Sequence, residues 1–196
     1  CKKSMNLCDI CKKNKVDIHV GTPLGENLHL CCECNNNLAA EYLDIPLTPF
    51  QNGIYEYTGI RGKTHTFRIH KIVHPVGIGY EADEITVDQS PGFKVAVMDN
   101  LDCDQAMLFD KLEAKIKKTI FKRYLKISKD SYVGKRTIIK NDEVVGRFEY
   151  DERNESIPMV VIDGKAFSWD ELGKMLTTYE GFQFALKIYD MTDDIK

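Results

Sequence analysis

The sequence lacks the motifs that mark the common enzyme families. It contains no G-x-x-x-x-G-K-[ST] phosphate loop, no G-x-G-x-x-G dinucleotide turn, no G-x-S-x-G nucleophile elbow and no H-E-x-x-H metalloprotease helix. These absences count against nucleotide hydrolysis, dinucleotide chemistry and the common hydrolase reactions. They leave open an enzyme whose site is assembled from residues far apart in the chain.

Long apolar runs are also missing. One of the longest, residues 157–162, contains Pro158 and is far too short to cross a bilayer. No charged-then-apolar leader opens the chain, and we detect no internal repeats or low-complexity tracts. The chain starts with Cys1, so we expect missing residues or a natural start at Met5. Because no apolar run is long enough to cross a bilayer, we expect no membrane partner.

The composition is that of an ordinary folded protein. The 196 residues are enough for one medium domain or two small ones, with 43% hydrophobic and 29% charged residues. The formal charge of -3 argues against a protein coated in nucleic acid, although it allows a local basic patch. Composition alone does not identify a partner or an oligomeric state.

Four of the seven cysteines form two C-x2-C pairs, Cys8/Cys11 and Cys31/Cys34. This spacing is typical of a structural Zn²⁺ site, in which four thiolates complete a tetrahedron and leave no position for substrate or activated water. Cys32 or His29 could replace Cys31 as the third ligand. The short spacing and the odd cysteine count favour reduced thiols, and hence a cytoplasmic location.

The residues around the cysteines predict a small finger in residues 1–46. Residues 16–20 and 28–31 alternate like strands, residues 21–27 have turn composition, and residues 38–43 predict a short helix. A knuckle, a hairpin and a last ligand pair beside a helix resemble a treble-clef zinc finger. The amides and dipole of the helix N-terminus would lower the pKa values of nearby thiols.

A second unit is predicted over residues 50–128. Residues 64–73, 76–84 and 93–98 have strand patterns, and glycines 77 and 79 indicate close approach of neighbouring backbone. A long helix is predicted near residues 102–127, with Asp102 or Asp104 as its cap. Its apolar stripe comprises Leu108, Leu112, Ile116, Ile120 and Tyr124.

A third unit is predicted over residues 136–196. We expect a hairpin over 136–150 turning at Asn141 and Asp142, a strand at 159–162 and a helix from Ser168 to 179 with a capping box. Gly181 would end that helix, and residues 182–189 favour a final strand. The predicted fold class is α+β. The whole chain resembles a family of uncharacterised bacterial proteins with an N-terminal zinc finger, and this resemblance implies no activity.

Three histidines, His65, His70 and His74, lie close to acidic residues that include Glu84. They suggest a catalytic metal site, but His65 and His70 fall on opposite faces of a strand. His70 and His74 share a face at a backbone separation of about 13 Å, which is too far for one ion unless Pro75 bends the chain. A binding surface and ordinary strand polarity are the alternatives.

Five lysines recur at steps of three and four along the predicted long helix. One face of that helix would carry them beside the basic N-terminus and form a phosphate-binding surface, or simply a solvated face. They are Lys111, Lys115, Lys118, Lys122 and Lys126.

The last third of the chain is rich in aromatic residues. Trp169, Tyr179, Phe182, Phe184 and Tyr189 are predicted to form a local core, and an exposed aromatic groove for a peptide or base is the alternative.

These patterns support three hypotheses. The first is a non-catalytic, zinc-stabilised interaction protein that binds a protein partner. The second is a nucleic-acid-binding module that uses the lysine face and the finger. The third is a metalloenzyme that uses His70, His74 and an acidic residue such as Glu84.

Overall fold

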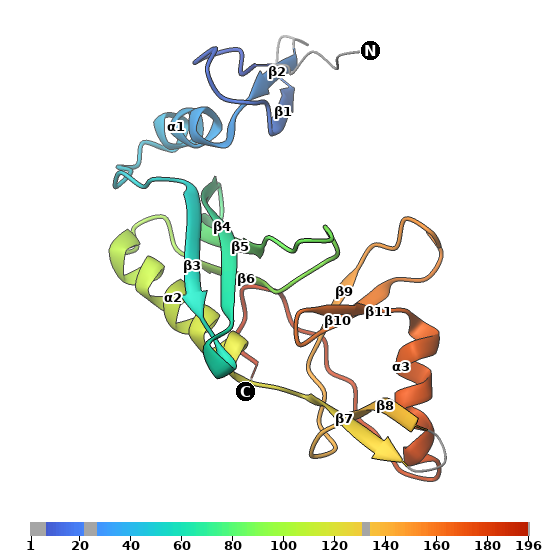
Figure 1. The fold of residues 1–196 in the computed structure, drawn as a ribbon. Coiled ribbons are helices and arrows are strands. Elements are labelled where there is room, and N and C mark those ends of the chain that lie inside the picture. The colour runs from blue at the N-terminus through green and yellow to red at the C-terminus, as the bar shows by residue number, and fades with distance from the viewer. Residues whose placement is uncertain (1–6, 22–26, 131–133, 196) are drawn as a thin grey trace.

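The computed structural model describes residues 7–21, 27–130 and 134–195 (Figure 1). Over these residues the protein is a mixed α+β structure with antiparallel sheets and three α-helices. We refer to residues 7–44 as the finger, to residues 45–121 as the body and to residues 122–195 as the C-terminal region. None of the helices in these ranges has the length and apolar character needed to cross a membrane.

The finger contains one hairpin and one helix. Strands β1 (Ile18–Gly21) and β2 (Asn27–Leu30) pair antiparallel, and α1 (Cys32–Leu43) follows directly. The helix begins at Cys32 rather than at the predicted residue 38, because Cys31 takes the extended N-cap conformation. The asparagine-rich stretch before residue 38 is therefore helical, although its composition favours a loop.

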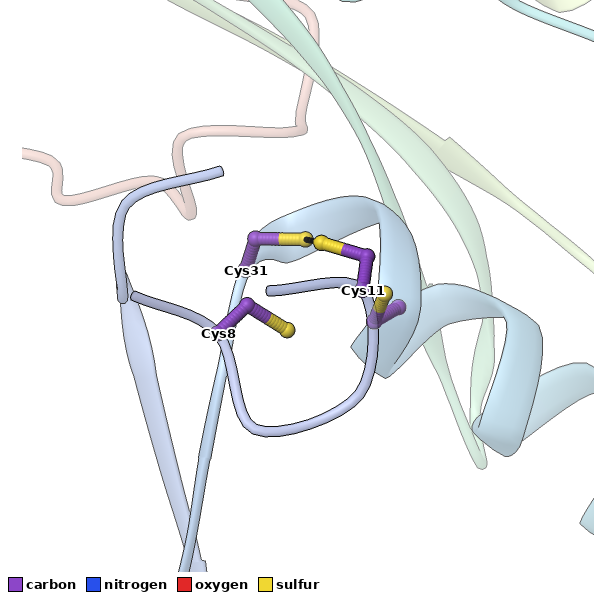
Figure 2. A group of neighbouring side chains, drawn as sticks. Cys8, Cys11 and Cys31 are labelled. Carbon is purple, nitrogen blue, oxygen red and sulfur yellow. Dashed lines mark hydrogen bonds between the residues drawn. The ribbon is translucent and has the colours of Figure 1, made fainter. Parts of the chain in front are cut away.

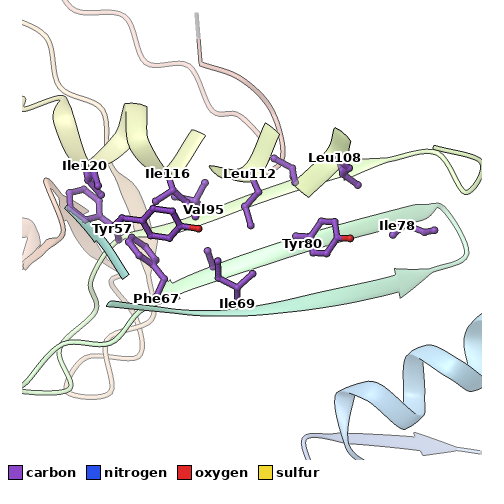
Figure 3. Close-up of a cluster of buried hydrophobic side chains, with 13 residues drawn as sticks. Tyr57, Phe67, Ile69, Ile78, Tyr80, Val95, Leu108, Leu112, Ile116 and Ile120 are labelled. Carbon is purple, nitrogen blue, oxygen red and sulfur yellow. The ribbon is translucent and has the colours of Figure 1, made fainter. Parts of the chain in front are cut away.

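The body is a four-stranded antiparallel sheet covered on one face by α2 (Gln105–Phe121) (Figures 1 and 3). The sheet order is β3 (Gly53–Thr58), β4 (Thr64–His74), β5 (Gly77–Glu84) and β6 (Lys94–Asp99), with η1 (Ile60–Gly62) between β3 and β4. The predicted strands at 64–73, 76–84 and 93–98 are confirmed. A Cβ on Gly79 would lie 2.7 Å from the carbonyl oxygen of Val97, which explains the glycine there.

The main core lies between this sheet and α2. Strand alternation turns Phe67 and Ile69 toward the helix, and helical spacing turns Leu112 and Ile116 toward the sheet (Figure 3). All four side chains are fully buried. Burial of each such large apolar side chain contributes about 1.5–3 kcal/mol to the stability of the body.

Helix α2 is shorter at both ends than the predicted helix over 102–127. Asp104 is its N-cap and accepts hydrogen bonds from the backbone N–H groups of Ala106 and Met107. At the other end, the carboxylate of Asp163 accepts the N–H groups of Tyr124 and Leu125. This distant contact captures N–H groups that helical residues would donate within the helix, so the chain is extended there.

The C-terminal region contains two small sheets and α3 (Trp169–Leu176). Strands β7 (Leu125–Asp130) and β8 (Gly134–Ile139) form one sheet, and β11 (Lys165–Phe167), β10 (Met159–Ile162) and β9 (Arg147–Glu149) form the other. The predicted hairpin over 136–150 is wrong, because β8 pairs with β7 and β9 pairs with β10. The turn at Asn141 and Asp142 is nevertheless present, with positive φ at both residues.

The end of the C-terminal region differs most from expectation. The predicted capping box opens α3, which continues into η2 (Thr177–Tyr179), and Gly181 follows with φ of 86°. Residues 182–190 are not paired as the predicted strand. The predicted aromatic core is also wrong, since Trp169, Phe182 and Phe184 are exposed.

Candidate metal centre

The structure brings the two cysteine pairs together at one point of the finger. One ligand atom from each of Cys8, Cys11, Cys31 and Cys34 lies within 4.8 Å of every other. Cys8 and Cys11 come from the knuckle before β1, whereas Cys31 and Cys34 come from the start of α1. Figure 2 shows the side chains of Cys8, Cys11 and Cys31 turned toward a common centre. We call these four residues the tetrad.

The sulfur spacing fits one tetrahedral ion. Zinc–sulfur bonds of about 2.3 Å place the sulfurs of a regular tetrahedron about 3.8 Å apart. The Sγ atoms of Cys11 and Cys31 are 3.9 Å apart. A disulfide would bring two sulfurs to about 2.05 Å, and all four thiols are free. The tetrad could therefore hold a metal ion of the size and preferences of Zn²⁺.

Backbone hydrogen bonds shape the knuckle. The N–H of Cys8 donates to the carbonyl oxygen of Asn14 at 2.9 Å, and the N–H of Lys12 donates to the carbonyl of Cys8 at 3.0 Å. Lys12 takes a left-handed conformation with φ of 53°, which closes the turn. The side-chain amide of Asn14 also reaches the sulfur of Cys31 at 3.7 Å. The two-residue gap thus folds both sulfurs of the pair to one side.

The local surroundings shift the thiol pKa values in opposite directions. Burial raises the pKa of Cys8, but hydrogen bonds from the backbone at Cys31, Cys11 and Ile10 outweigh burial and lower it to about 6. Hydrogen bonds from the backbone at Asn14 and Lys13 lower the pKa of Cys11. Burial, followed by the neighbouring sulfurs, raises the pKa of Cys34 to about 12.

Four clustered thiolates repel one another, so ionising the first thiols makes ionising the last one costly. A divalent cation at the centre removes this conflict, since a coordinated thiol is deprotonated. The donor set and the charge balance both suit a bound metal.

The alternative ligands Cys32 and His29 are placed elsewhere. Cys32 donates from its sulfur to the carbonyl oxygen of Lys71 at 3.2 Å, away from the tetrad. Burial, followed by the charge of Asp17, raises the pKa of Cys32 to about 11. The ring of His29 contacts His19 across the hairpin. Cys31 therefore completes the tetrad.

The finger is joined to the body through α1. Strand β3 pairs with β4 only as far as Ile69, which leaves the backbone edge of β4 open beyond that point. The buried side chain of Asn36 fills this edge: its amide nitrogen donates to the carbonyl of Lys71 at 2.7 Å, and its oxygen accepts the N–H of Val73 at 3.1 Å. Asn36 therefore acts as a side-chain substitute for a missing strand.

The histidines of β4 do not assemble the suggested catalytic site. His65 is buried, and its Nδ1 lies 2.6 Å from a carboxylate oxygen of Glu84. His70 lies on the opposite face of the strand, 3.6 Å from Glu81, and His74 is exposed at the strand end. Across the part of the chain that the structure describes, only the tetrad groups three or more candidate ligands.

The five lysines do not share one helical face. Lys111, Lys115 and Lys118 lie on α2, but Lys122 is its C-cap and Lys126 lies on β7. The prediction is wrong on this point because the helix ends at Phe121, so helical spacing no longer applies beyond it.

Three of these lysines are also engaged by other groups, and one of them, Lys122, lies 3.6 Å from a carboxylate oxygen of Glu143. The ammonium of Lys115 shares its three N–H donors among the carbonyl oxygens of Ala96, Met191, Thr192 and Asp193, which lie 2.7–3.2 Å away. Lys111 forms an ion pair with Asp99 at 3.2 Å. These contacts reduce the positive charge that the helix offers to a phosphate.

Two stretches of the chain match family models. Residues 48–121 match the model described as Domain of unknown function (DUF7686), and residues 125–193 match Domain of unknown function (DUF7713). No curated protein and no solved structure matches the chain. Neither description names an activity, so function has to be argued from the geometry.

Proposed function

We propose that this protein is a non-catalytic interaction protein, held in shape by a structural Zn²⁺ in a treble-clef finger, that binds a protein partner through residues 182–188. The single observation that carries the proposal is a stripe of four exposed apolar side chains. Phe182 is 72% exposed, Phe184 91%, Leu186 71% and Ile188 64%. A closed four-thiolate shell leaves the metal a structural role, and six free cysteines among the described residues favour a reducing, cytoplasmic setting.

The stripe has the pattern of a strand without a partner. Its large apolar residues alternate with the polar Gln183 and Lys187 and the small Ala185, which is the period of a half-buried strand. Among the described residues, no hydrogen bond reaches the backbone of residues 183–189. Both the apolar face and the main-chain groups of this segment are therefore available.

Contacts at both ends hold the segment in place. Before it, the hydroxyl of Tyr179 donates to Asp142 at 2.8 Å. After it, the ammonium of Lys115 binds the carbonyl oxygens of residues 191–193. A segment fixed at both ends loses less conformational entropy on binding than a free tail does.

The partner that fits this segment is a protein with an open sheet edge and an apolar face beside it. Strand addition satisfies the free main-chain groups, and the alternate side chains provide specificity. Burying four large apolar side chains contributes about 6–12 kcal/mol before costs. Association costs about 4–15 kcal/mol, so the main-chain hydrogen bonds are needed for stable binding.

The test compares two variants with the same added charge. The Phe184→Asp/Leu186→Asp variant places two carboxylates in the stripe, and the matched control Gln183→Asp/Ala185→Asp places them between its members. Partners are quantified by cross-linking and mass spectrometry, and amide exchange is then measured on the purified complex. We expect the stripe variant to recover at least about tenfold less of one partner than the control does. In the complex of the unmodified protein with that partner, the amides of residues 183–189 should be protected from exchange.

Equal recovery of every partner by the two variants, or no protection of residues 183–189, would overturn the proposal. Light scattering on the purified protein distinguishes a different protein from a second copy of this chain as the partner. If the unmodified protein and the control are dimers and the stripe variant is a monomer, the partner is a second copy of this chain.

A further inference from the structure

We propose that His19 and His29 form a second metal site, exchangeable and distinct from the tetrad, which binds a divalent transition metal such as Zn²⁺. The two residues lie directly opposite each other in the β1–β2 register. Their Nδ1 atoms are in contact, and the ring centroids are 4.7 Å apart at an interplanar angle of 81°.

The hairpin backbone enforces this approach. Both backbone groups of His29 are taken by Asp9: the N–H of Asp9 donates to the carbonyl of His29, and the N–H of His29 donates to the Asp9 carboxylate, each at 2.8 Å. His29 is therefore not hydrogen-bonded to His19 through the backbone. In an antiparallel ladder, opposing residues that are not hydrogen-bonded through the backbone have the closest Cα atoms, at about 4.5 Å, and the closest side chains.

Two facing imidazole nitrogens repel each other if both present lone pairs. Either one neutral ring donates its N–H to the other, or both lone pairs bind one metal ion. Neutral imidazole is a preferred ligand of Zn²⁺, Cu²⁺ and Ni²⁺. With bonds of 2.0–2.1 Å and a tetrahedral angle, the two nitrogens would sit about 3.3 Å apart, which needs only a small outward swing of the rings.

This site differs from the tetrad in position and in chemistry. Val20, Leu28 and Leu30 pack against the cysteines. Because side chains alternate across a strand, the histidine pair lies on the other face of the hairpin. His19 is exposed, so water can complete the coordination shell. The carboxylate of Asp9 lies beside the backbone of His29 and is paired with the ammonium of Lys12 at 3.4 Å. An open shell of two imidazoles and water exchanges its ion, whereas four thiolates enclose theirs.

The experiment is a zinc titration of the full chain with the tightly held ion already bound. Equilibrium dialysis with metal analysis gives the stoichiometry, and ¹⁵N NMR of the imidazole rings reports which nitrogens bind. We expect two ions per chain at saturation for the unmodified protein and for the control His74→Ala, in which an exposed histidine of the body is removed. At the free zinc concentration that half-fills the second site of the unmodified protein, we expect little more than one ion per chain for His19→Gln and for His29→Gln.

The affinity of the second site should fall at least about tenfold in these variants, since even an outer partner of a metal ligand is worth 10- to 100-fold. Retention of the first ion shows that the finger of each variant is folded. Saturation of the unmodified protein at one ion, or an unchanged second ion in His19→Gln, would overturn the proposal. Absence of any chelator-resistant ion would contradict the structural Zn²⁺ instead, and the ring shifts of His19 and His29 still report the second site.

Discussion

The finger and the body are stabilised by different means. The buried cluster of the finger consists of Cys8, Leu30 and Cys31, so two of its three members are candidate ligands. The buried cluster of the body has thirteen members: Phe93, just before β6, and twelve residues from the four strands and α2. Units below about 40 residues rarely bury enough apolar surface to fold alone and usually need a metal or disulfides. The comparison teaches that one chain can join a unit built around four candidate metal ligands to a unit built around a large apolar core.

Removing the metal should produce the largest difference between the finger and the body. In Cys8→Ser, or after chelation, we expect the finger to lose its fold while the body keeps its own, because structural Zn²⁺ sites contribute about 10–16 kcal/mol of binding free energy. Amide exchange should rise throughout α1 and remain slow in β4, β5 and β6. Cys103→Ser is the control, as Cys103 lies outside the tetrad. A finger that stays protected without metal would refute the division.

A cavity in the core of the body should destabilise the body and leave the finger unchanged. Leu112 is fully buried between α2 and the sheet, so Leu112→Ala should lower the free energy of unfolding of the body by about 2–5 kcal/mol. Urea denaturation followed by circular dichroism measures this change. The metal content should be unaffected, whereas Lys118→Ala, on the exposed side of the same helix, should change stability by less than about 0.5 kcal/mol. Loss of metal from Leu112→Ala would show that the finger depends on the body core.

The most local effect is expected at the junction between α1 and β4. Asn36→Ala leaves the carbonyl of Lys71 and the N–H of Val73 without this partner, at a cost of about 1–3 kcal/mol per buried group. We expect faster amide exchange near Val73 and a looser α1, with the metal retained. Asn37→Ala is the control, because Asn37 is exposed on the same helix. If the two variants behave alike, Asn36 does not join the finger to the body.

Local patterns predicted the parts of the protein that local physics controls. The two-residue gap in each cysteine pair lets both sulfurs reach one centre, and the tetrad gathers as that spacing indicates. Alternation over 64–98 predicted β4, β5 and β6, three of the four strands of the body, and the stripe from Leu108 to Ile120 predicted the buried face of α2. Each pattern repeats with the period of its own element, so no distant contact was needed to recognise it.

The errors arose where a distant residue decided the outcome. Asp163 ends the helical run by accepting hydrogen bonds from N–H groups near Tyr124, and no residue beside Tyr124 in the sequence predicts that contact. The pairing of β8 with β7 rather than β9 depends on the same change of direction. A signal for the histidine pair was present, since His19 and His29 lie in two adjacent predicted strands. Only the register places them opposite each other.

The sequence by itself determined the ligand spacing, the strand and helix periods of the body, and the alternating apolar residues near the C-terminus. The tertiary structure alone decided that Asn36 completes the edge of β4, that α2 stops at Phe121, and that the stripe from Phe182 to Ile188 faces solvent. The physical reason is that periodicity shows which side chains share a face. Which surface or hydrogen-bonding group meets that face depends on residues far away in the chain.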